Sequence, residues 1–342
     1  MSGRAIAILL AIVALIAVPY AITEAYYVNI ASQILLYAIF ALGLNILVGY
    51  AGLVSLGHAG LFGVASYVVA SLLAAHYGHA TAIVAALVVA LVFTAGFAAL
   101  SLRATGIGFI MITLALGEIL WGLAYRWISL TNGDNGVNVA GRPKPFGIVL
   151  SSAPAFYETT LIVFLLAIAA CAIFVRSPFG AALAGTRDQP RRMNALGYHV
   201  WMIRFGAFMF SGLLTAIAGI LFVYYNLFIS PQTLALAASA EALLMVISGG
   251  AGTLMGPIVG ATLVVIVKNV VSGVRLDGTG VGVYVINQLF QHWNFLLGAI
   301  FVLIVVFMPE GLVPGVVRLS RALWRSVSRA KPAPARVAGS QS

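Results

Sequence analysis

Three ionisable residues, His58, Glu118 and Glu241, lie inside long apolar stretches of this 342-residue chain. A charge at the depth of a bilayer costs at least about 2.5–3.5 kcal/mol, so each of these side chains is expected to face protein or water. The functional interpretation is the polar lining of a solute path, or a proton relay. The structural interpretation, which the residue types favour, is a hydrogen bond or ion pair between helices. Asn45 and Ser55 belong to the same group of candidates.

Two glycine-rich stretches have a similar spacing. The first contains Gly49, Gly52 and Gly57, and the second contains Gly249, Gly250, Gly252 and Gly256. Glycine lets helix backbones approach closely and permits helix breaks at membrane depth. Paired interrupted segments in two halves of a transporter can mark its path, and close packing without a path role is the alternative. Neither stretch is a phosphate loop, because no lysine follows a glycine with the Walker A spacing.

The segment 176–204 carries charged and apolar side chains together. Ser177 can cap a helix that begins at Pro178, and Gly197 can end the last turn in the left-handed conformation. Pro190 cannot lie inside a helix without cost, so we expect two short helices near 178–188 and 190–196. Their candidate contact residues are Ser177, Pro178, Phe179, Arg187, Asp188, Arg191, Arg192, Leu196 and Gly197. Such a basic helical pair can dock on another subunit; a loop that lies on the membrane surface is the alternative.

The composition restricts the class of protein. Hydrophobic residues make up 62% of the chain and charged residues 8%, whereas a soluble domain has about 25% charged residues. This excludes a soluble globular enzyme and a disordered chain. The sequence contains no metalloprotease motif, nucleophile elbow or Cys/His metal spacing, and the lone Cys171 makes no disulfide framework. We therefore expect no catalytic residues, no cofactor and no metal site.

The elements that position these residues are expected to be transmembrane helices, in an all-α polytopic bundle. A span needs about 20 apolar residues. Ten such segments can be recognised, at 5–22, 30–48, 58–75, 81–101, 107–125, 159–175, 205–226, 234–249, 254–271 and 290–308. We interpret the first as a retained anchor rather than a cleaved signal peptide, because its apolar core is long. Residues 234–271 form either two spans or a re-entrant segment followed by one span.

Lys and Arg residues favour a cytoplasmic N-terminus and C-terminus. In this orientation 13 of them fall on the inner side and four on the outer side, with Lys268 in the membrane, as the positive-inside rule requires. The transmembrane domain then covers 1–315, with an outer loop at 126–157 and a cytoplasmic loop at 176–204. Residues 316–342 form a basic tail that we expect to be cytoplasmic and disordered. Because the basic residues gather in one loop and one tail, nucleic-acid binding is not expected.

The stretch from Leu42 to Ala59 resembles the signature of LivM-type permeases from branched-chain amino acid ABC importers. Further stretches fit the same family in the same order, at 103–118, 131–143, 177–197, 241–257 and 308–312. The resemblance covers roughly residues 30–315, and as an ordered set these motifs are specific to the family.

The resemblance implies a multi-pass subunit of a bacterial inner-membrane importer, surrounded by membrane lipid. A periplasmic binding protein would deliver a branched-chain or related hydrophobic amino acid, and this chain would form the path with a second, LivH-type permease. Two ATP-binding subunits would drive transport, so ATP hydrolysis would occur on other chains. The family has its coupling helix in the loop after the sixth span, here Ser177 to Gly197. Pro190 is a departure, because the family more often has a polar or acidic residue there.

Three other functions remain open at this point, one of which is a structural or receptor membrane subunit that would carry no substrate flux. Related permeases carry urea or amides, so the substrate is not fixed by the resemblance. A function from a different class is a proton-coupled secondary transporter of a small solute, which would use Glu118 and Glu241.

Overall fold

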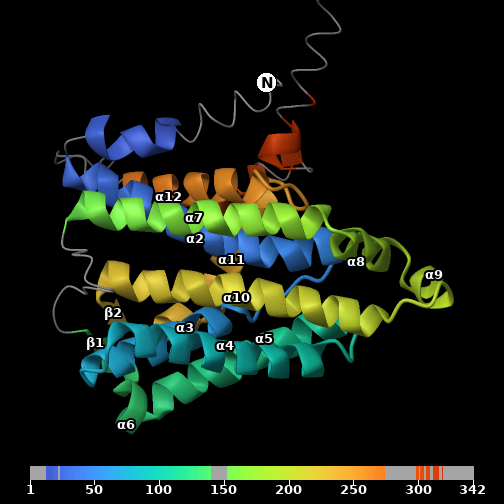
Figure 1. Ribbon diagram of the computed structural model, residues 1–342, viewed down its shortest axis with the longest axis horizontal. Coiled ribbons are helices and arrows are strands. Elements are labelled where there is room, and N and C mark those ends of the chain that lie inside the picture. Colours follow the sequence, from blue (N-terminus) through green and yellow to red (C-terminus); the bar gives the residue numbers. More distant parts are fainter. Residues whose placement is uncertain are drawn as a thin grey trace, which may run out of the picture.

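The computed structural model describes residues 13–21, 24–139 and 152–273, with short pieces between 298 and 318. It is a helical bundle in which the long helices run side by side (Figure 1). The α-helices are α2 (Ala25–Asn45), α3 (His58–Ala74), α4 (His79–Ser101), α5 (Ile107–Arg126), α6 (Ile128–Thr131), α7 (Ala153–Arg176), α8 (Pro178–Asp188), α9 (Pro190–Ala195), α10 (Val200–Asn226), α11 (Leu236–Gly249) and α12 (Gly256–Gly273). A π-helical turn, η1 (Ile46–Ala51), extends α2, and two 3₁₀ turns are η2 (Gly133–Asn135) and η4 (Pro231–Leu234).

Five helical segments of the described chain are long and apolar enough to cross a membrane. They are Ala25–Ala51, His79–Ser101, Ile107–Arg126, Ala153–Arg176 and Val200–Asn226. The other apolar helices, α3, α11 and α12, are shorter. The expected all-α membrane fold is therefore confirmed, while the number of ten spans and the side of each terminus stay predictions.

Several expected features lie outside the described residues. These are residues 5–12 of the first expected span, residues 140–151 of the outer loop, most of the expected span 290–308 and nearly all of the tail 316–342.

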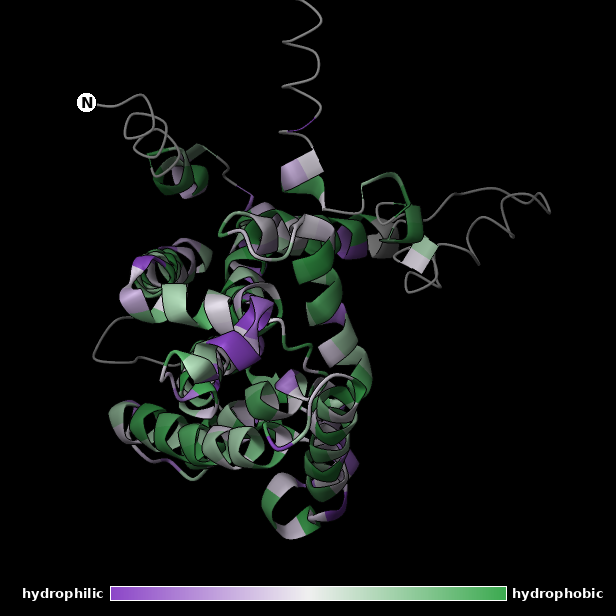
Figure 2. Cartoon of the chain, turned by 90° about the vertical axis from the view of Figure 1, so that its right-hand side faces the viewer, coloured by the Kyte–Doolittle hydropathy of each residue, from purple (hydrophilic) through white to green (hydrophobic). Residues whose placement is uncertain are grey.

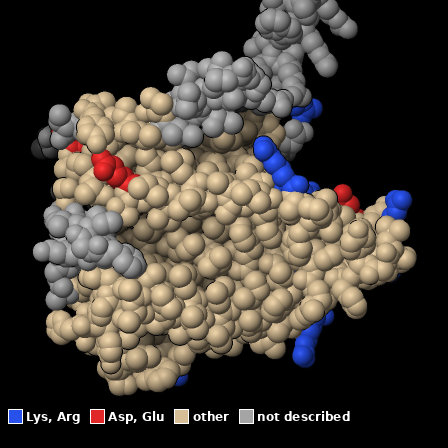
Figure 3. All heavy atoms as spheres, in the orientation of Figure 1, with Lys and Arg blue, Asp and Glu red and all other residues tan. Residues whose placement is uncertain are grey.

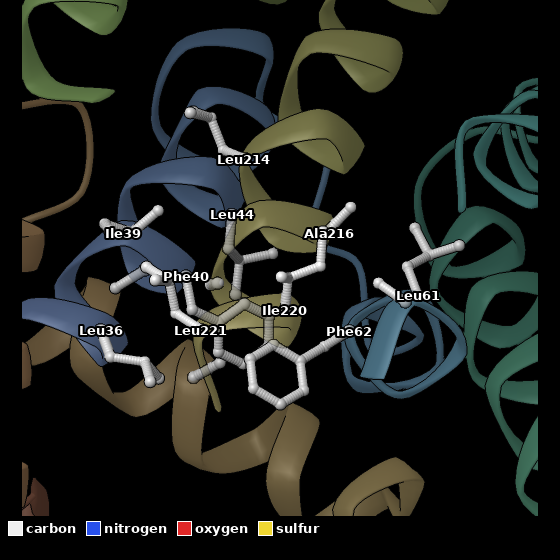
Figure 4. Close-up of a cluster of buried hydrophobic side chains, with 14 of the residues drawn as sticks. Leu36, Ile39, Phe40, Leu44, Leu61, Phe62, Leu214, Ala216, Ile220 and Leu221 are labelled. Atoms are coloured by element: carbon white, nitrogen blue, oxygen red, sulfur yellow. The ribbon is translucent and has the colours of Figure 1, made fainter. Parts of the chain in front are cut away.

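The core lies between α2, α10 and α3. In the most apolar part of each span, 78% of α2 with η1 and 67% of α10 are buried, against 28% for each of α4, α5 and α7. Figure 4 shows Leu36, Phe40 and Leu44 of α2 packed close to Phe62 of α3 and Leu221 of α10. The peripheral helices are mostly hydrophobic along their length (Figure 2). Since their outward side chains have few protein neighbours, those surfaces suit lipid.

Residues 234–271 form two helices rather than one. Glu241 pairs with Lys268, and both Gly249 with Gly256 and Met245 with Gly260 come into close contact, so α11 and α12 are antiparallel. The 14 residues of α11 extend about 21 Å, which is less than the hydrocarbon thickness of about 30 Å. Its length alone therefore leaves both expected arrangements of this region open.

The two ends of the bundle carry different structures. At one end, β1 (Val137–Asn138) and β2 (Phe228–Ile229) form an antiparallel pair with Val137 opposite Ile229. This pair, which the sequence does not predict, ties the outer loop to the segment after α10. At the opposite end, α8 and α9 project from the bundle (Figure 1). The described residues of the outer loop, 126–139 and 152–157, thus lie at the opposite end from the loop 176–204.

Candidate functional site

The helices α8 and α9 begin and end where their capping residues predict. Ser177 Oγ accepts a hydrogen bond from the Gly180 amide at 3.2 Å, and Pro178 is the first helical residue. The second helix begins at Pro190, where its missing N–H is tolerated. Gly197 has φ +86°, the left-handed conformation expected after a helix end. The two predicted short helices are confirmed.

The side chains of this helical pair divide into two groups. Phe179 faces the bundle, with its ring 5.1 Å from that of Phe174. Arg191 and Arg192 are exposed, and Leu196 keeps 64% of its surface accessible. Figure 3 shows blue Lys and Arg atoms at this end and a broad uncharged face along the helices. The polar residues at this end lie near the centre of the view in Figure 2, among hydrophobic helices. The outward surface is therefore basic, with the exposed apolar side chain of Leu196 beside the two arginines.

Arg187 connects α8 to the end of α2. Its Nη1 donates a hydrogen bond to the carbonyl oxygen of Gly49 in η1. Its side chain also crosses Gly52, where a Cβ would lie 2.9 Å from Arg187 Cγ. Gly52 has φ +69°, so this position suits glycine for both space and backbone conformation. The neighbouring Asp188 is an exposed partner at 4.0 Å, and such surface pairs contribute little to stability.

The two glycine-rich stretches meet at this place. Asn45 Oδ1 accepts a hydrogen bond from the Gly252 amide and Asn45 Nδ2 donates one to Thr253 O, both at 2.9 Å. A Cβ on Gly49 would overlap the backbone of Gly252, and one on Gly249 would overlap the carbonyl of Gly256. The glycines thus permit backbone-to-backbone contact.

We call this cluster the glycine junction. It consists of Asn45, Gly49, Gly52, Arg187, Gly249, Gly250, Gly252, Thr253 and Gly256. Gly250 has φ +117° and follows the last residue of α11, so the chain turns there before α12. The junction joins the end of α2, the turn between α11 and α12, and α8.

His58 and Ser55 form a separate chain of buried hydrogen bonds. Ser211 Oγ donates to Gly43 O at 2.6 Å, so its only proton is used and it must accept from His58 Nε2, 2.9 Å away. In the neutral imidazole, Nδ1 of His58 is then the acceptor, and Ser55 Oγ, 2.8 Å away, donates to it. Both imidazole nitrogens are satisfied, and the chain ties α3 to α10 and α2. Gly57 lies beside it, and a Cβ there would overlap Thr113 O.

Glu241 lies at a cavity of about 210 Å³ and pairs with Lys268. The carboxylate and the ammonium are 3.3 Å apart, and 17% and 31% of the two side chains are accessible. Lys268 was expected to lie in the membrane, but no role was predicted for it from the sequence. The available signal was the presence of two opposite charges in consecutive apolar segments, since each needs a partner at that depth.

Glu118 lies apart from these clusters. It is half-buried on α5 and has no hydrogen bond or ion pair within the part of the chain that the structure describes. The same described residues contain no group of three or more His, Cys, Asp or Glu side chains that could hold a metal ion. The predicted polar residues therefore divide among the glycine junction, the His58 chain, the cavity and an isolated position on α5.

Comparisons with known proteins agree with this architecture. A family model described as "Branched-chain amino acid transport system / permease component" matches residues 26–308. The high-affinity branched-chain amino acid transport system permease protein LivM of Salmonella typhimurium is 28% identical over 84% of this chain and 70% of its own length. LivM of Escherichia coli is 27% identical over the same shares.

A second group of relatives is named for a different substrate. The autoinducer 2 import system permease protein LsrC of Salmonella paratyphi B is 30% identical over 55% of this chain and 51% of its own length. No solved structure matches the chain.

Proposed function

This chain belongs to the family of permease components of branched-chain amino acid transport systems, and we propose that it is the membrane-spanning subunit of an ATP-driven importer for branched-chain or related hydrophobic amino acids. In this proposal it crosses the bacterial inner membrane ten times with both termini in the cytoplasm. A periplasmic binding protein delivers the solute, and a second, LivH-type permease completes the path. Two separate ATP-binding subunits hydrolyse ATP.

The observation that carries the proposal is the connection between the projecting helices and the glycine junction. The outward side of α8 and α9 presents Arg191, Arg192 and Leu196, a basic and partly apolar surface that suits a protein partner. On the inward side, Arg187 binds the backbone of η1. A partner that binds this surface of α9 therefore acts through the adjoining α8, which is joined to the end of α2 by Arg187.

The mechanism follows from differential binding. ATP can change the permease only if the ATP-binding subunits bind one of its arrangements more tightly than another. Movement of α8 would carry Gly49 through Arg187, and Gly49 is in backbone contact with Gly252 between α11 and α12. Because packed backbones cannot deform continuously, these helices would move together and expose the path to alternate sides.

The docking role is tested by charge reversal on the outward surface. The variant Arg191→Glu/Arg192→Glu should lose co-purification of the ATP-binding subunits, because both contacts with an acidic partner surface would become repulsive. The matched control is Arg103→Glu, an exposed arginine between α4 and α5, which should retain them. Normal recovery of these subunits with the double variant would contradict the docking role.

The rival secondary transporter is distinguished by its energy source. Uptake through the importer should require co-expressed ATP-binding subunits and should continue after an uncoupler removes the proton gradient. Uphill uptake by the purified chain alone, without nucleotide, would overturn the proposal. Competition of labelled leucine uptake by valine, isoleucine, urea, amides and autoinducer 2 then identifies the substrate class.

A further inference from the structure

The cavity beside Glu241 is lined by charged, uncharged polar and apolar side chains. The charged wall is the Glu241–Lys268 pair, contributed by α11 and α12, and the apolar wall includes Phe40, Phe62, Phe222 and Met245. Tyr37, Gln232 and Thr233 add uncharged polar groups to the lining. At about 210 Å³ the cavity has room for several water molecules, each of which needs about 30 Å³ in the liquid. It therefore suits a small solute.

The cavity lies between the glycine junction and the end of the bundle that carries β1 and β2, since Gln232 and Thr233 of η4 line it and Gln232 is exposed. Lys268 follows Gly256 by twelve residues of α12, so it lies about 18 Å along the helix from the glycine junction. Glu241 precedes Gly249 by eight residues of α11, or about 12 Å. In a hydrocarbon core of about 30 Å, a solute there would be on its way across.

The charged wall has both signs and no net charge. A solute with a carboxylate and an ammonium group can bind Lys268 and Glu241 at once, in two charge-assisted contacts. A phosphorylated solute would place a second anion beside Glu241, and an uncharged sugar would offer neither Glu241 nor Lys268 an opposite charge. Charge complementarity therefore favours a zwitterion over either alternative.

The apolar wall is aromatic and is built by three helices. The ring centroids of Phe40 on α2 and Phe62 on α3 are 4.8 Å apart, and those of Phe62 and Phe222 on α10 are 5.3 Å apart. Figure 4 shows Phe40 and Phe62 close together, with Leu221 beside them. Apolar walls with a few convergent polar groups are typical of small-molecule sites. The wall suits an aliphatic side chain.

We propose that this cavity is a transient binding site for α-amino acids with apolar side chains. Lys268 binds the α-carboxylate, Glu241 binds the α-ammonium group, and the aromatic wall takes the side chain. The proposal rests on the amino acid import proposed above, and it adds that this subunit selects the solute in addition to the binding protein. Because Glu241 and Lys268 also bind each other, their pair competes with the solute and keeps its affinity low, as passage through a transporter requires.

The test exchanges the two charges. Removal of one charge would take an ion-pair partner from the other inside an apolar bundle, which is destabilising in itself, whereas Glu241→Lys/Lys268→Glu keeps a pair. The exchanged site would accept a zwitterion only in the reversed orientation, which turns its side chain away from the aromatic wall. In the complete importer in proteoliposomes with its binding protein and ATP, we expect labelled leucine uptake to fall at least tenfold while the partner subunits still co-purify. Glu158→Gln, at an exposed carboxylate, should retain normal uptake.

A second variant tests the cavity without altering the charges. Ala238 also lines the cavity, so Ala238→Phe should fill it and lower leucine uptake at least fivefold in an assembled complex. If the Glu241→Lys/Lys268→Glu variant does not assemble with its partner subunits, Ala238→Phe tests the binding site by itself. Wild-type uptake rates with either assembled variant would overturn this inference and leave the proposed function intact. ATP-driven import of an uncharged solute instead of leucine by the wild-type complex would also overturn it, while absence of any ATP-driven import would overturn both proposals.

Discussion

The glycine junction and the charged cavity lie along the same pair of helices, α11 and α12. The junction is formed mainly by backbone atoms, whereas the cavity is formed by side chains. At the junction, backbone meets backbone, and the side chains of Asn45 and Arg187 bind backbone atoms. At the cavity, side chains from several helices surround open space. A close-packed contact has few alternative arrangements, whereas long side chains beside a cavity can adjust. The comparison suggests that the junction sets the relative position of helices and the cavity accommodates a solute.

The largest expected effect is from added volume at the junction. Gly249→Val would force side-chain atoms into the carbonyl of Gly256, so we expect loss of folded protein in detergent, measured by size-exclusion chromatography. Ala238→Val places the same kind of side chain beside the cavity, where space is available, and should leave the melting temperature within a few degrees of wild type. Equal tolerance of both variants would remove the distinction between the two regions.

Loss of one amide side chain should have an intermediate effect. Asn45→Ala leaves the Gly252 amide and the Thr253 carbonyl without their Asn45 partner, which should lower the free energy of unfolding by about 1–3 kcal/mol. Gln33 on α2 is the matched control, since it accepts from Asn269 of α12 at 3.0 Å. Asn269 also bonds Val265 O, so Gln33→Ala should cost under about 1 kcal/mol. Thermal unfolding of both variants checks the order, and a reversed order would contradict the importance of the junction.

The smallest effect is expected at the surface next to the junction. Asp188→Ala removes a 4.0 Å pair in which both side chains are more than half accessible, so the change in unfolding free energy should be under about 0.5 kcal/mol. Arg187→Ala removes the bond to Gly49 O and should cost about 1 kcal/mol. Thermal unfolding of the Asp188→Ala and Arg187→Ala variants, measured in parallel, compares their losses of unfolding free energy. A larger loss for Asp188→Ala would show that Arg187 acts mainly through its acidic neighbour.

Local signals in the sequence were sufficient to predict the two projecting helices, α8 and α9. Ser177, Pro178, Pro190 and Gly197 each have a conformational preference that does not depend on the rest of the fold. The apolar segments were equally clear, because hydropathy over about 20 residues is a local property. These signals predicted where α8 and α9 begin and end, and which segments are long apolar helices.

Contacts between distant segments were not predictable in the same way. Glu241 and Lys268 were both recognised in apolar stretches, but their pairing depends on how α11 and α12 align, and the sequence does not specify this. The similar glycine spacing suggested two related segments, and only the fold shows that Gly49 contacts Gly252. The β1–β2 pair has strands of two residues each, too short for any periodic pattern.

The π-helical turn at the end of α2 has a mechanical consequence. In η1 the amides of Gly52 and Leu53 both bond the carbonyl of Leu47, and the Gly49 carbonyl accepts from an arginine of another helix. Arg187 therefore grips the main chain directly, and little of any pull from α8 is lost to rotation of an intervening side chain at η1. A displacement of the Gly49 carbonyl in η1 would therefore be passed to α2 through the main chain.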